Sequence, residues 1–332
     1  MIASKAENRG GERRDQLEPR STADGSLTLW SERFGECFHS SAGARREAEQ
    51  KFVQPAQLER CRSGAPVVVL DLCVGLGYNT AALLEAASSR GLQLQWLGLE
   101  LDPRPLQLAL GDAGFRGLWQ GPTLAVLQQL SGSGQWHQPG LGQGRWWLGD
   151  ARRQLPELVA EQRGRVDLIL HDAFSPGHCP ELWTVEVLTG LAALLKPQGR
   201  LLTYCAAAAV RRGLQLAGLE LASIGAAAGV TERGSDTTWS LGTAASPTPF
   251  FAPGSAGSAA ASAALLQPLS AMEQEHLLSR AAEPFRDPSG MADAATLQAE
   301  RAARQRHHPG ESTSAWSRRW GLSRQAAPDR GA

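Results

Sequence analysis

The stretch VVVLDLCVGLGYN, residues 67–79, decides the fold predicted for this chain. Its β-branched apolar run predicts a buried strand over Val67–Leu72, and glycines follow at once. Gly75 and Gly77 let the backbone approach a ligand that a side chain would exclude. A dinucleotide fingerprint would place a third glycine at Thr80, and no GK[ST] triplet of a phosphate loop follows. A tight strand-to-helix turn without a ligand is the alternative.

Alternating strands and helices are predicted after this stretch. The further strands are expected at Leu94–Leu99, Arg145–Leu148, Val166–Leu170 and Arg200–Tyr204. The helices are expected at Asn79–Ser88, Pro105–Ala113, Arg152–Gln162, Glu181–Leu195 and Ala207–Ala217. Such alternation predicts an α/β fold with a mainly parallel sheet covered by helices on both faces, and a ligand site at the carboxyl ends of the strands.

Acidic residues follow two of these strands. Glu100 is placed to accept hydrogen bonds from both hydroxyls of a ribose, although it could instead cap the next helix, a task that suits Asp102 better. Asp150 could accept a hydrogen bond from an adenine amino group, or serve as a helix N-cap. Together with Asp71, Gly75, Gly77 and Asn79, these carboxylates predict an S-adenosyl-L-methionine site. The corresponding fold is a class I, Rossmann-like methyltransferase with a mainly parallel seven-stranded sheet.

A loop rich in functional side chains follows the fourth strand: HDAFSPGHCPELW, residues 171–183. We refer to residues 172–183 as the acceptor loop, because the transferable methyl group should point toward this place in such a fold. Asp172 can receive or orient an amine. His171 and His178 are interpreted as loop residues without a chemical role, since no metal ligand set or nucleophile accompanies them. Trp183 fits a pocket wall or ordinary helix–sheet packing equally well.

Four stretches resemble the methyltransferase domain of the MnmC family. The acceptor loop is similar to that family's Asp-x-Phe-x-Pro segment followed by Asn-Pro-x-Met/Leu-Trp. Residues 28–34 with Gly43 and Glu47 resemble its amino-terminal signature, in which a Ser-x-x-Phe segment precedes a Gly and a Glu. Residues 71–79 resemble its glycine loop, and residues 210–219 resemble its Val-Arg-Arg-x-Leu helix. The resemblance covers roughly residues 27–243.

The resemblance implies an enzyme that methylates the exocyclic amine of 5-aminomethyl-(2-thio)uridine at the wobble position of tRNA. The substrate would be the anticodon loop, and the product the 5-methylaminomethyl form. It implies that Asp172 is catalytic and that substrate contacts come from Phe174, Pro176, Trp183 and Arg211. The chain departs from the family at Cys73, which stands where the loop usually has glycine, and at residues 178–179, where His-Cys replaces Lys-Asn.

Two other functions stay open at this point. One is a small-molecule amine methyltransferase or an aminopropyltransferase of the same fold. The other is a non-catalytic RNA-binding module, suggested by Cys73 and by the poor match of the segment around Arg233 to the family. The bifunctional family members also carry a flavin-dependent oxidase domain. The residues after Thr243 are too few and too rich in Ala and Ser for one, so we expect a stand-alone methyltransferase.

Composition bounds these functions. The chain has 33 Lys+Arg and 33 Asp+Glu, so its total charge gives no argument for nucleic acid binding, although a local basic patch remains open. Five widely spaced cysteines without a CxxC pair predict neither a disulfide framework nor a structural zinc, and no metal is expected. The N-terminus carries mixed charges, and no apolar run reaches the roughly 18 residues of a membrane span. We expect a soluble cytoplasmic protein without membrane attachment.

The chain is predicted to have four parts. Residues 1–26 should be disordered, 27–243 form the methyltransferase domain, and 244–264 form a linker rich in Ala, Ser, Gly and Pro. Residues 265–332 form a partly helical extension with a disordered end, its helices around Ala271–Ala281 and Ala292–Gln305. Arginines and Trp316 and Trp320 near that end suit RNA by charge and stacking, and a non-functional tail is the alternative.

Overall fold

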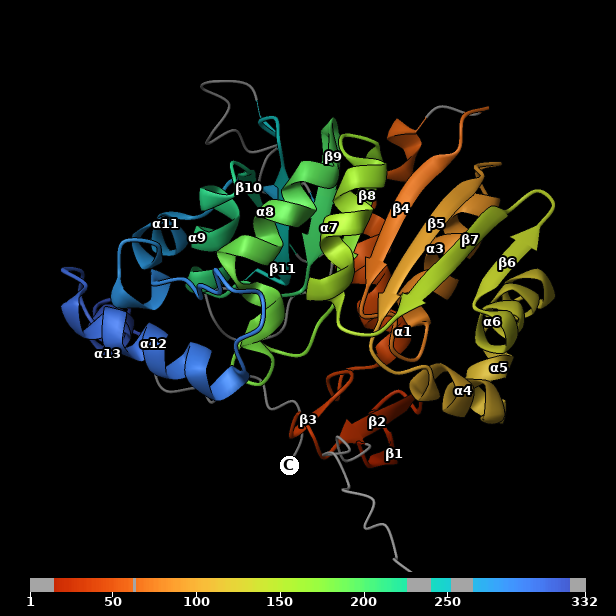
Figure 1. Ribbon diagram of the computed structural model, residues 1–332, viewed down its shortest axis with the longest axis horizontal. Coiled ribbons are helices and arrows are strands. Elements are labelled where there is room, and N and C mark those ends of the chain that lie inside the picture. The colour runs from red at the N-terminus through yellow and green to blue at the C-terminus, as the bar shows by residue number, and fades with distance from the viewer. Residues whose placement is uncertain (1–14, 62–63, 226–239, 252–264, 323–332) are drawn as a thin grey trace, which may run out of the picture.

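A mixed β-sheet with helices on both faces forms the centre of the chain (Figure 1). The computed structural model describes residues 15–61, 64–225, 240–251 and 265–322. Within them the sheet has nine strands in the order β12-β10-β11-β9-β8-β4-β5-β7-β6. Its strands, in chain order, are β4 (Val67–Leu72), β5 (Leu94–Glu100), β6 (Gln135–Gln138), β7 (Gly142–Leu148), β8 (Val166–His171), β9 (Leu195–Thr203), β10 (Glu220–Ile224), β11 (Gly242–Ser246) and β12 (Leu266–Gln267).

All five strands expected from the sequence are present, and they form the parallel middle of the sheet. β4 pairs in parallel with β5 and β8, β5 with β7, and β8 with β9. Their carboxyl ends therefore meet at one edge. The prediction of a mainly parallel sheet of seven strands needs correction, because both sides are antiparallel: β6 on β7, and β11, β10 and β12 beyond β9. These outer strands are short and lack crossover helices, so their hydrophobic pattern was too weak to predict them from the sequence.

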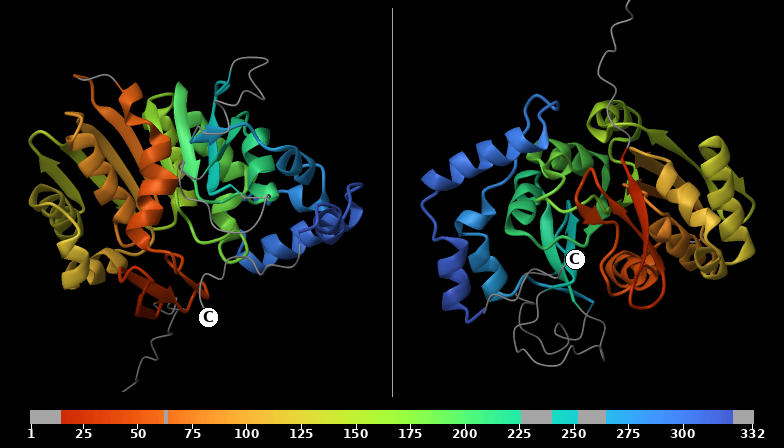
Figure 2. Two further views of the ribbon diagram at one scale, coloured as in Figure 1. Left: turned by 180° about the vertical axis from the view of Figure 1, so that it is seen from behind. Right: turned by 90° about the horizontal axis from the view of Figure 1, so that it is seen from below.

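Helices cover both faces of this sheet, as Figures 1 and 2 show. The first face carries a helical stretch near the N-terminus and the helices after β4 and β5: α1 (Ala44–Glu47), η1 (Ala48–Val53), α2 (Gln54–Ala56), η2 (Leu58–Arg60), α3 (Tyr78–Ser88), α4 (Arg104–Gly111), α5 (Ala113–Gly117) and α6 (Gly121–Ser133). The second face carries the helices after β7, β8 and β9: α7 (Ala151–Gln162), η3 (Pro180–Trp183), α8 (Val185–Leu194) and α9 (Ala208–Leu216).

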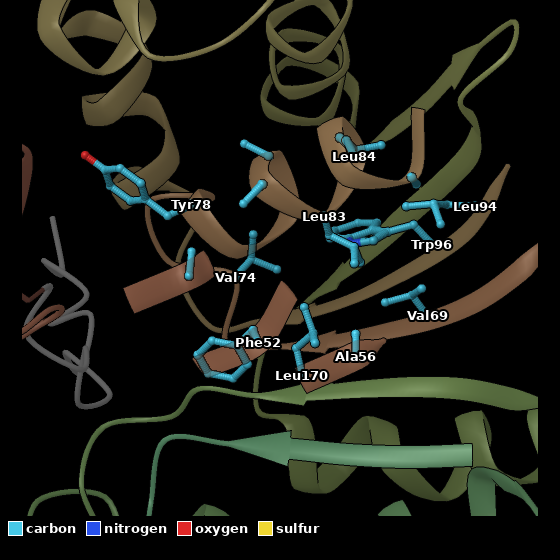
Figure 3. Packing of buried hydrophobic residues seen from close by; sticks show 14 of the residues in the cluster. Phe52, Ala56, Val69, Val74, Tyr78, Leu83, Leu84, Leu94, Trp96 and Leu170 are labelled. Carbon is cyan, nitrogen blue, oxygen red and sulfur yellow. The ribbon is translucent and has the colours of Figure 1, made fainter. Parts of the chain in front are cut away.

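Helix α3 is apolar around most of its surface, so it is buried on nearly every side. Leu83 and Leu84 are fully buried, and they lie with Trp96 of β5 and Val69 of β4 (Figure 3). Full burial of each such side chain stabilises the fold by roughly 1.5–3 kcal/mol. This packing fixes the start of α3, and therefore the glycine loop before it, against the carboxyl ends of β4 and β5.

The N-terminal segment is ordered from residue 15, which corrects the prediction of disorder for residues 1–26 in its second half. A small antiparallel sheet is made of β1 (Leu17–Ser21), β2 (Leu27–Ser31) and β3 (Glu36–Cys37). It lies below the carboxyl ends of the central strands in Figure 1. Polar side chains hold it: Asp15 accepts hydrogen bonds from the Ser31 hydroxyl and from the Arg33 amide, and Arg20 lies over the ring of Trp30. Residues 1–14 lie outside the described part.

The boundary expected at residue 243 is also wrong, because β11 runs through it and β12 adds a strand from the supposed extension. The rest of the linker, 252–264, lies outside the described residues, as do 229–239 with Arg233. The extension then forms α11 (Ala271–His276), η4 (Arg280–Ala282), α12 (Ala294–His307) and α13 (Thr313–Arg319), beside the second helical face (Figure 2). Trp316 is buried and stacks on His276 with ring centres 4.0 Å apart, so it is not available to RNA.

Candidate active site

A cavity of about 470 Å³ lies at the carboxyl ends of the parallel strands. The small N-terminal sheet, the glycine loop, the start of α4, the start of α7 and the acceptor loop all contribute to its walls. Predicted site residues among its lining are Gly75, Glu100, Asp150, Asp172 and Phe174. A cavity of this size and position suits a small-molecule cofactor at the strand ends of an α/β sheet.

The glycine loop has the backbone shape that its sequence predicts. Gly75 and Gly77 have φ angles of +55° and +89°, a region that L side chains rarely adopt. A Cβ at Gly75 would lie 3.1 Å from Cδ1 of Phe38, so a side chain there would require the Phe38 ring to move by a few tenths of an ångström in addition to the strained φ. Cys73 also has a left-handed φ, +68°, and its side chain lines the cavity. Cys73 therefore adopts a backbone conformation that favours glycine.

The two carboxylates expected to bind the cofactor both reach the cavity. Glu100 is buried, and its oxygens accept the amides of Gly75 at 2.8 Å and Asp102 at 2.9 Å. Burial raises its pKa, although these backbone amides oppose the shift. Asp150 is the N-cap of α7 and accepts the Arg152 amide at 2.9 Å. The N-cap reading is confirmed for Asp150, and its place in the cavity leaves the adenine contact as a prediction.

Neither Asp71 nor Asn79 lines the cavity, and both contribute to the site only through hydrogen bonds to other residues. Asp71 is fully buried and accepts the Thr80 hydroxyl at 2.6 Å, which ties the end of β4 to the start of α3. Burial raises its pKa to about 7. Asn79 is also buried, and its Nδ2 donates to Oδ2 of Asp172 at 2.8 Å. Both residues therefore position the loop and the candidate catalytic carboxylate, where the sequence had suggested direct cofactor contacts. Gly77 likewise faces Leu106 and Leu127 of the core.

Side chains from four different elements hold the start of the acceptor loop. Each of residues 172–175 forms one hydrogen bond with such a side chain, and the partners span the chain from β3 to the end of β9. The pairs are Asn79 Nδ2 with Asp172 at 2.8 Å, Tyr204 hydroxyl with the Ala173 carbonyl at 2.9 Å, Trp183 Nε1 with the Phe174 carbonyl at 2.8 Å, and Glu36 Oε2 with the Ser175 amide at 2.9 Å. A loop held at four consecutive residues presents Asp172 in one preorganised position.

Trp183 supports this loop from inside the protein. It has no exposed surface and stacks on His171, with ring centres 4.0 Å apart. The packing interpretation is therefore correct, and the predicted contact with substrate is not, because the indole is fully buried and does not line the cavity. Burial lowers the pKa of His171 to about 3, so its ring is neutral and carries no acid–base role at ordinary pH. Pro176 is partly buried and also lies outside the cavity lining.

Arg211 is buried and does not have the substrate-binding role that was predicted for it. Its side chain is 2% exposed, and its Nη1 pairs with Oε1 of Glu273 at 2.8 Å. Nε also donates to the Thr243 hydroxyl at 2.9 Å. The correction has a simple cause: a Val-Arg-Arg pattern does not say which arginine faces solvent, and the buried partner comes 62 residues later in the chain.

An aromatic cluster at the cavity was not assigned to the site from the sequence. Phe34 stacks on Phe174 with centres 4.5 Å apart, and the edge of Phe38 meets Phe174 at 4.9 Å. All three rings line the cavity. Phe34 belongs to the Ser-x-x-Phe segment noted above, so that motif was the available signal.

These features fit S-adenosyl-L-methionine: a glycine loop with left-handed φ angles at Gly75 and Gly77, and a buried carboxylate, Glu100, at the end of the second parallel strand. Residues 118–233 match the model of a family described as S-adenosyl-L-methionine-dependent methyltransferase. The fold is that of an S-adenosyl-L-methionine-dependent methyltransferase. The class of cofactor predicted from the sequence is therefore confirmed.

The curated relatives of this chain include MnmC proteins. It is 29% identical over 212 residues to the bifunctional tRNA 5-methylaminomethyl-2-thiouridine biosynthesis protein MnmC of Aeromonas salmonicida, covering 58% of this chain and 31% of the relative. It is 33% identical over 210 residues to MnmC of Azoarcus sp., with shares of 58% and 31%. The chain thus spans about a third of the length of these curated relatives.

A solved structure, MNMC2 from Aquifex aeolicus, matches with a TM-score of 0.69 at 25% identity. The match covers 89% of this chain and 86% of that one. It therefore reaches well beyond the part that the sequence resemblance covered. In the described part of the chain, no helix is long and apolar enough to cross a membrane.

Proposed function

We propose that this methyltransferase acts on tRNA and methylates the exocyclic amine of 5-aminomethyl-(2-thio)uridine at the wobble position. The observation that carries the proposal is the fixed carboxylate of Asp172, held by Asn79 at 2.8 Å in a cavity with three phenylalanine rings. The names of the MnmC relatives support this substrate over a small-molecule amine, a polyamine or a purely binding role.

Methyl transfer to an amine needs the neutral form of the amine, because the ammonium form has no lone pair. When bound, S-adenosyl-L-methionine supplies an activated methyl group on a sulfonium sulfur. Asp172 accepts a hydrogen bond from the amine, orients its lone pair and helps it lose a proton. Asn79 donates to Oδ2 of this carboxylate at 2.8 Å and holds it in place. Phe34 and Phe174 exclude water from the surroundings, so positioning supplies most of the acceleration.

The direct test uses bulk tRNA from a strain that lacks the gene, analysed by mass spectrometry of its nucleosides. We expect 5-aminomethyl uridine to accumulate, and purified protein with S-adenosyl-L-methionine to convert it to the methylaminomethyl form. An unchanged nucleoside profile together with no conversion would refute the tRNA assignment and redirect the search to small amines.

The role of Asp172 is tested with Asp172→Asn, which keeps the shape and removes the charge. We expect kcat to fall by roughly 10²–10⁴-fold, a typical range for lost acid–base assistance. Binding of S-adenosylhomocysteine, measured by calorimetry, should stay within twofold. Glu157→Gln, on the exposed side of α7, is the matched control and should keep full turnover. Full turnover in Asp172→Asn would exclude this carboxylate from the chemistry.

A further inference from the structure

Three arginines line the cavity among the described residues: Arg33, Arg104 and Arg152. Two of them are neutralised. Arg104 Nε donates to Oδ2 of Asp102 at 2.8 Å. Arg152 pairs with Asp150 at 2.8 Å and with Asp287 at 3.2 Å. A guanidinium with a carboxylate partner attracts a further anion only weakly.

Arg33 differs from the other two. Its side chain has no carboxylate partner within the described part of the chain, and the residue is exposed at the rim of the cavity. Its backbone is nevertheless fixed, because its amide donates to Oδ1 of Asp15 at 2.8 Å. A positive charge without an internal partner, on a fixed backbone, is suited to bind an external anion.

Arg33 also lies beside the aromatic cluster. The guanidinium carbon is 5.4 Å from the ring centre of Phe34, which in turn stacks on Phe174. Both rings are partly exposed. Proteins that bind single-stranded RNA combine these two elements, a cation for the backbone and an aromatic face for an unstacked base.

We propose that Arg33 binds a backbone phosphate of the RNA next to the target nucleotide, while the Phe34 and Phe174 rings contact a base. This inference rests on the proposed function and adds a recognition residue to it. It gives a chain of zero net charge a local attraction for RNA at the mouth of its site.

The experiment compares Arg33→Gln and Arg33→Lys with Arg163→Gln. Arg163 is an exposed arginine that follows α7 at the opposite ends of the strands, and it has no ion pair within the described residues. The affinity for an anticodon stem-loop is measured by fluorescence anisotropy with S-adenosylhomocysteine present, over a range of salt concentrations. KM and kcat are measured on deletion-strain tRNA.

For Arg33→Gln we expect Kd and KM to rise about 5–20-fold with kcat within twofold. The slope of log K against log salt should fall by about 0.7–0.9, the loss of one phosphate contact. Arg33→Lys should keep that slope, and Arg163→Gln should match the wild type. An unchanged Kd and slope in Arg33→Gln, or a loss confined to kcat, would overturn the proposal. Slope changes without methyl transfer by any form would refute the proposed function and leave the phosphate contact standing.

Discussion

Replacing Arg211 by methionine tests whether this arginine is a buried structural residue or an RNA contact. The side chain is 2% exposed and its partner Glu273 is 5% exposed, so removal of the arginine leaves a carboxylate in the interior. Three serine hydroxyls, of Ser223, Ser240 and Ser270, still donate to Glu273. They compensate its charge only in part.

Breaking such a pair on one side costs about 3–5 kcal/mol, a large share of the roughly 5–15 kcal/mol that stabilises a typical domain. At about 2 °C per kcal/mol for a chain of this size, Tm should fall by roughly 6–10 °C. The double variant Arg211→Met/Glu273→Met should recover most of this loss, because it leaves no unpaired charge.

The pH dependence adds an independent check. Burial alone would raise the pKa of Glu273, but the charge and hydrogen bonds of Arg211 lower it to about 2. The pair therefore stabilises the fold fully above pH 4.5, and that contribution is lost as pH falls from about 4.5 toward 2. Urea unfolding at pH 7 and at pH 3.5 should show a smaller difference between wild type and Arg211→Met at the acid pH.

A stable Arg211→Met protein whose KM for tRNA rises with a reduced salt slope would refute this reasoning. It would restore the phosphate contact that the sequence suggested. The structural account instead predicts that folded Arg211→Met retains its tRNA affinity.

Two further predictions concern the glycine loop. Cys73→Gly relieves the strain of a left-handed φ of +68°, which costs a non-glycine residue about 1–2 kcal/mol, but it adds about 0.5–1 kcal/mol of conformational entropy to the unfolded chain. We therefore expect the free energy of unfolding in urea to rise by roughly 0.5 kcal/mol. The affinity for S-adenosylhomocysteine, measured by calorimetry, should not fall. Asp71→Asn removes a carboxyl whose pKa is raised from 3.8 to about 7; the wild type pays an electrostatic penalty that grows from about pH 4 to pH 7, so the variant should gain stability relative to it across that interval. Destabilisation of the glycine variant by 1 kcal/mol or more, or a pH-independent difference for the asparagine variant, would contradict these two accounts.

The parallel middle of the sheet could be predicted because the sequence pattern that identifies each of its strands is local. The strands β4, β5 and β8 are apolar runs buried at nearly every position, and the helices after β4, β5, β7 and β9 begin within six residues of the strand end. Val67–Leu72 was predicted with both bounds correct for this reason. Asp172 and Glu100 were found on the same basis, since a polar residue directly after a buried strand must lie at the ligand edge of the sheet.

The rest of the structure depends on contacts between residues that are distant in sequence, and a polar residue gives no local signal of such a partner. The strand Leu17–Ser21 is mostly polar and has no buried residue, so nothing in it distinguishes a paired strand from a disordered tail. Its order comes from pairing with Leu27–Ser31 and from Asp15. In the same way, Arg211 could be placed in the interior only by knowing that Glu273 returns to meet it. The two end segments that composition separated from the domain therefore help to build it. The N-terminal segment forms part of the cavity wall, and the C-terminal extension adds a strand to the sheet and supplies Glu273, which neutralises the buried Arg211.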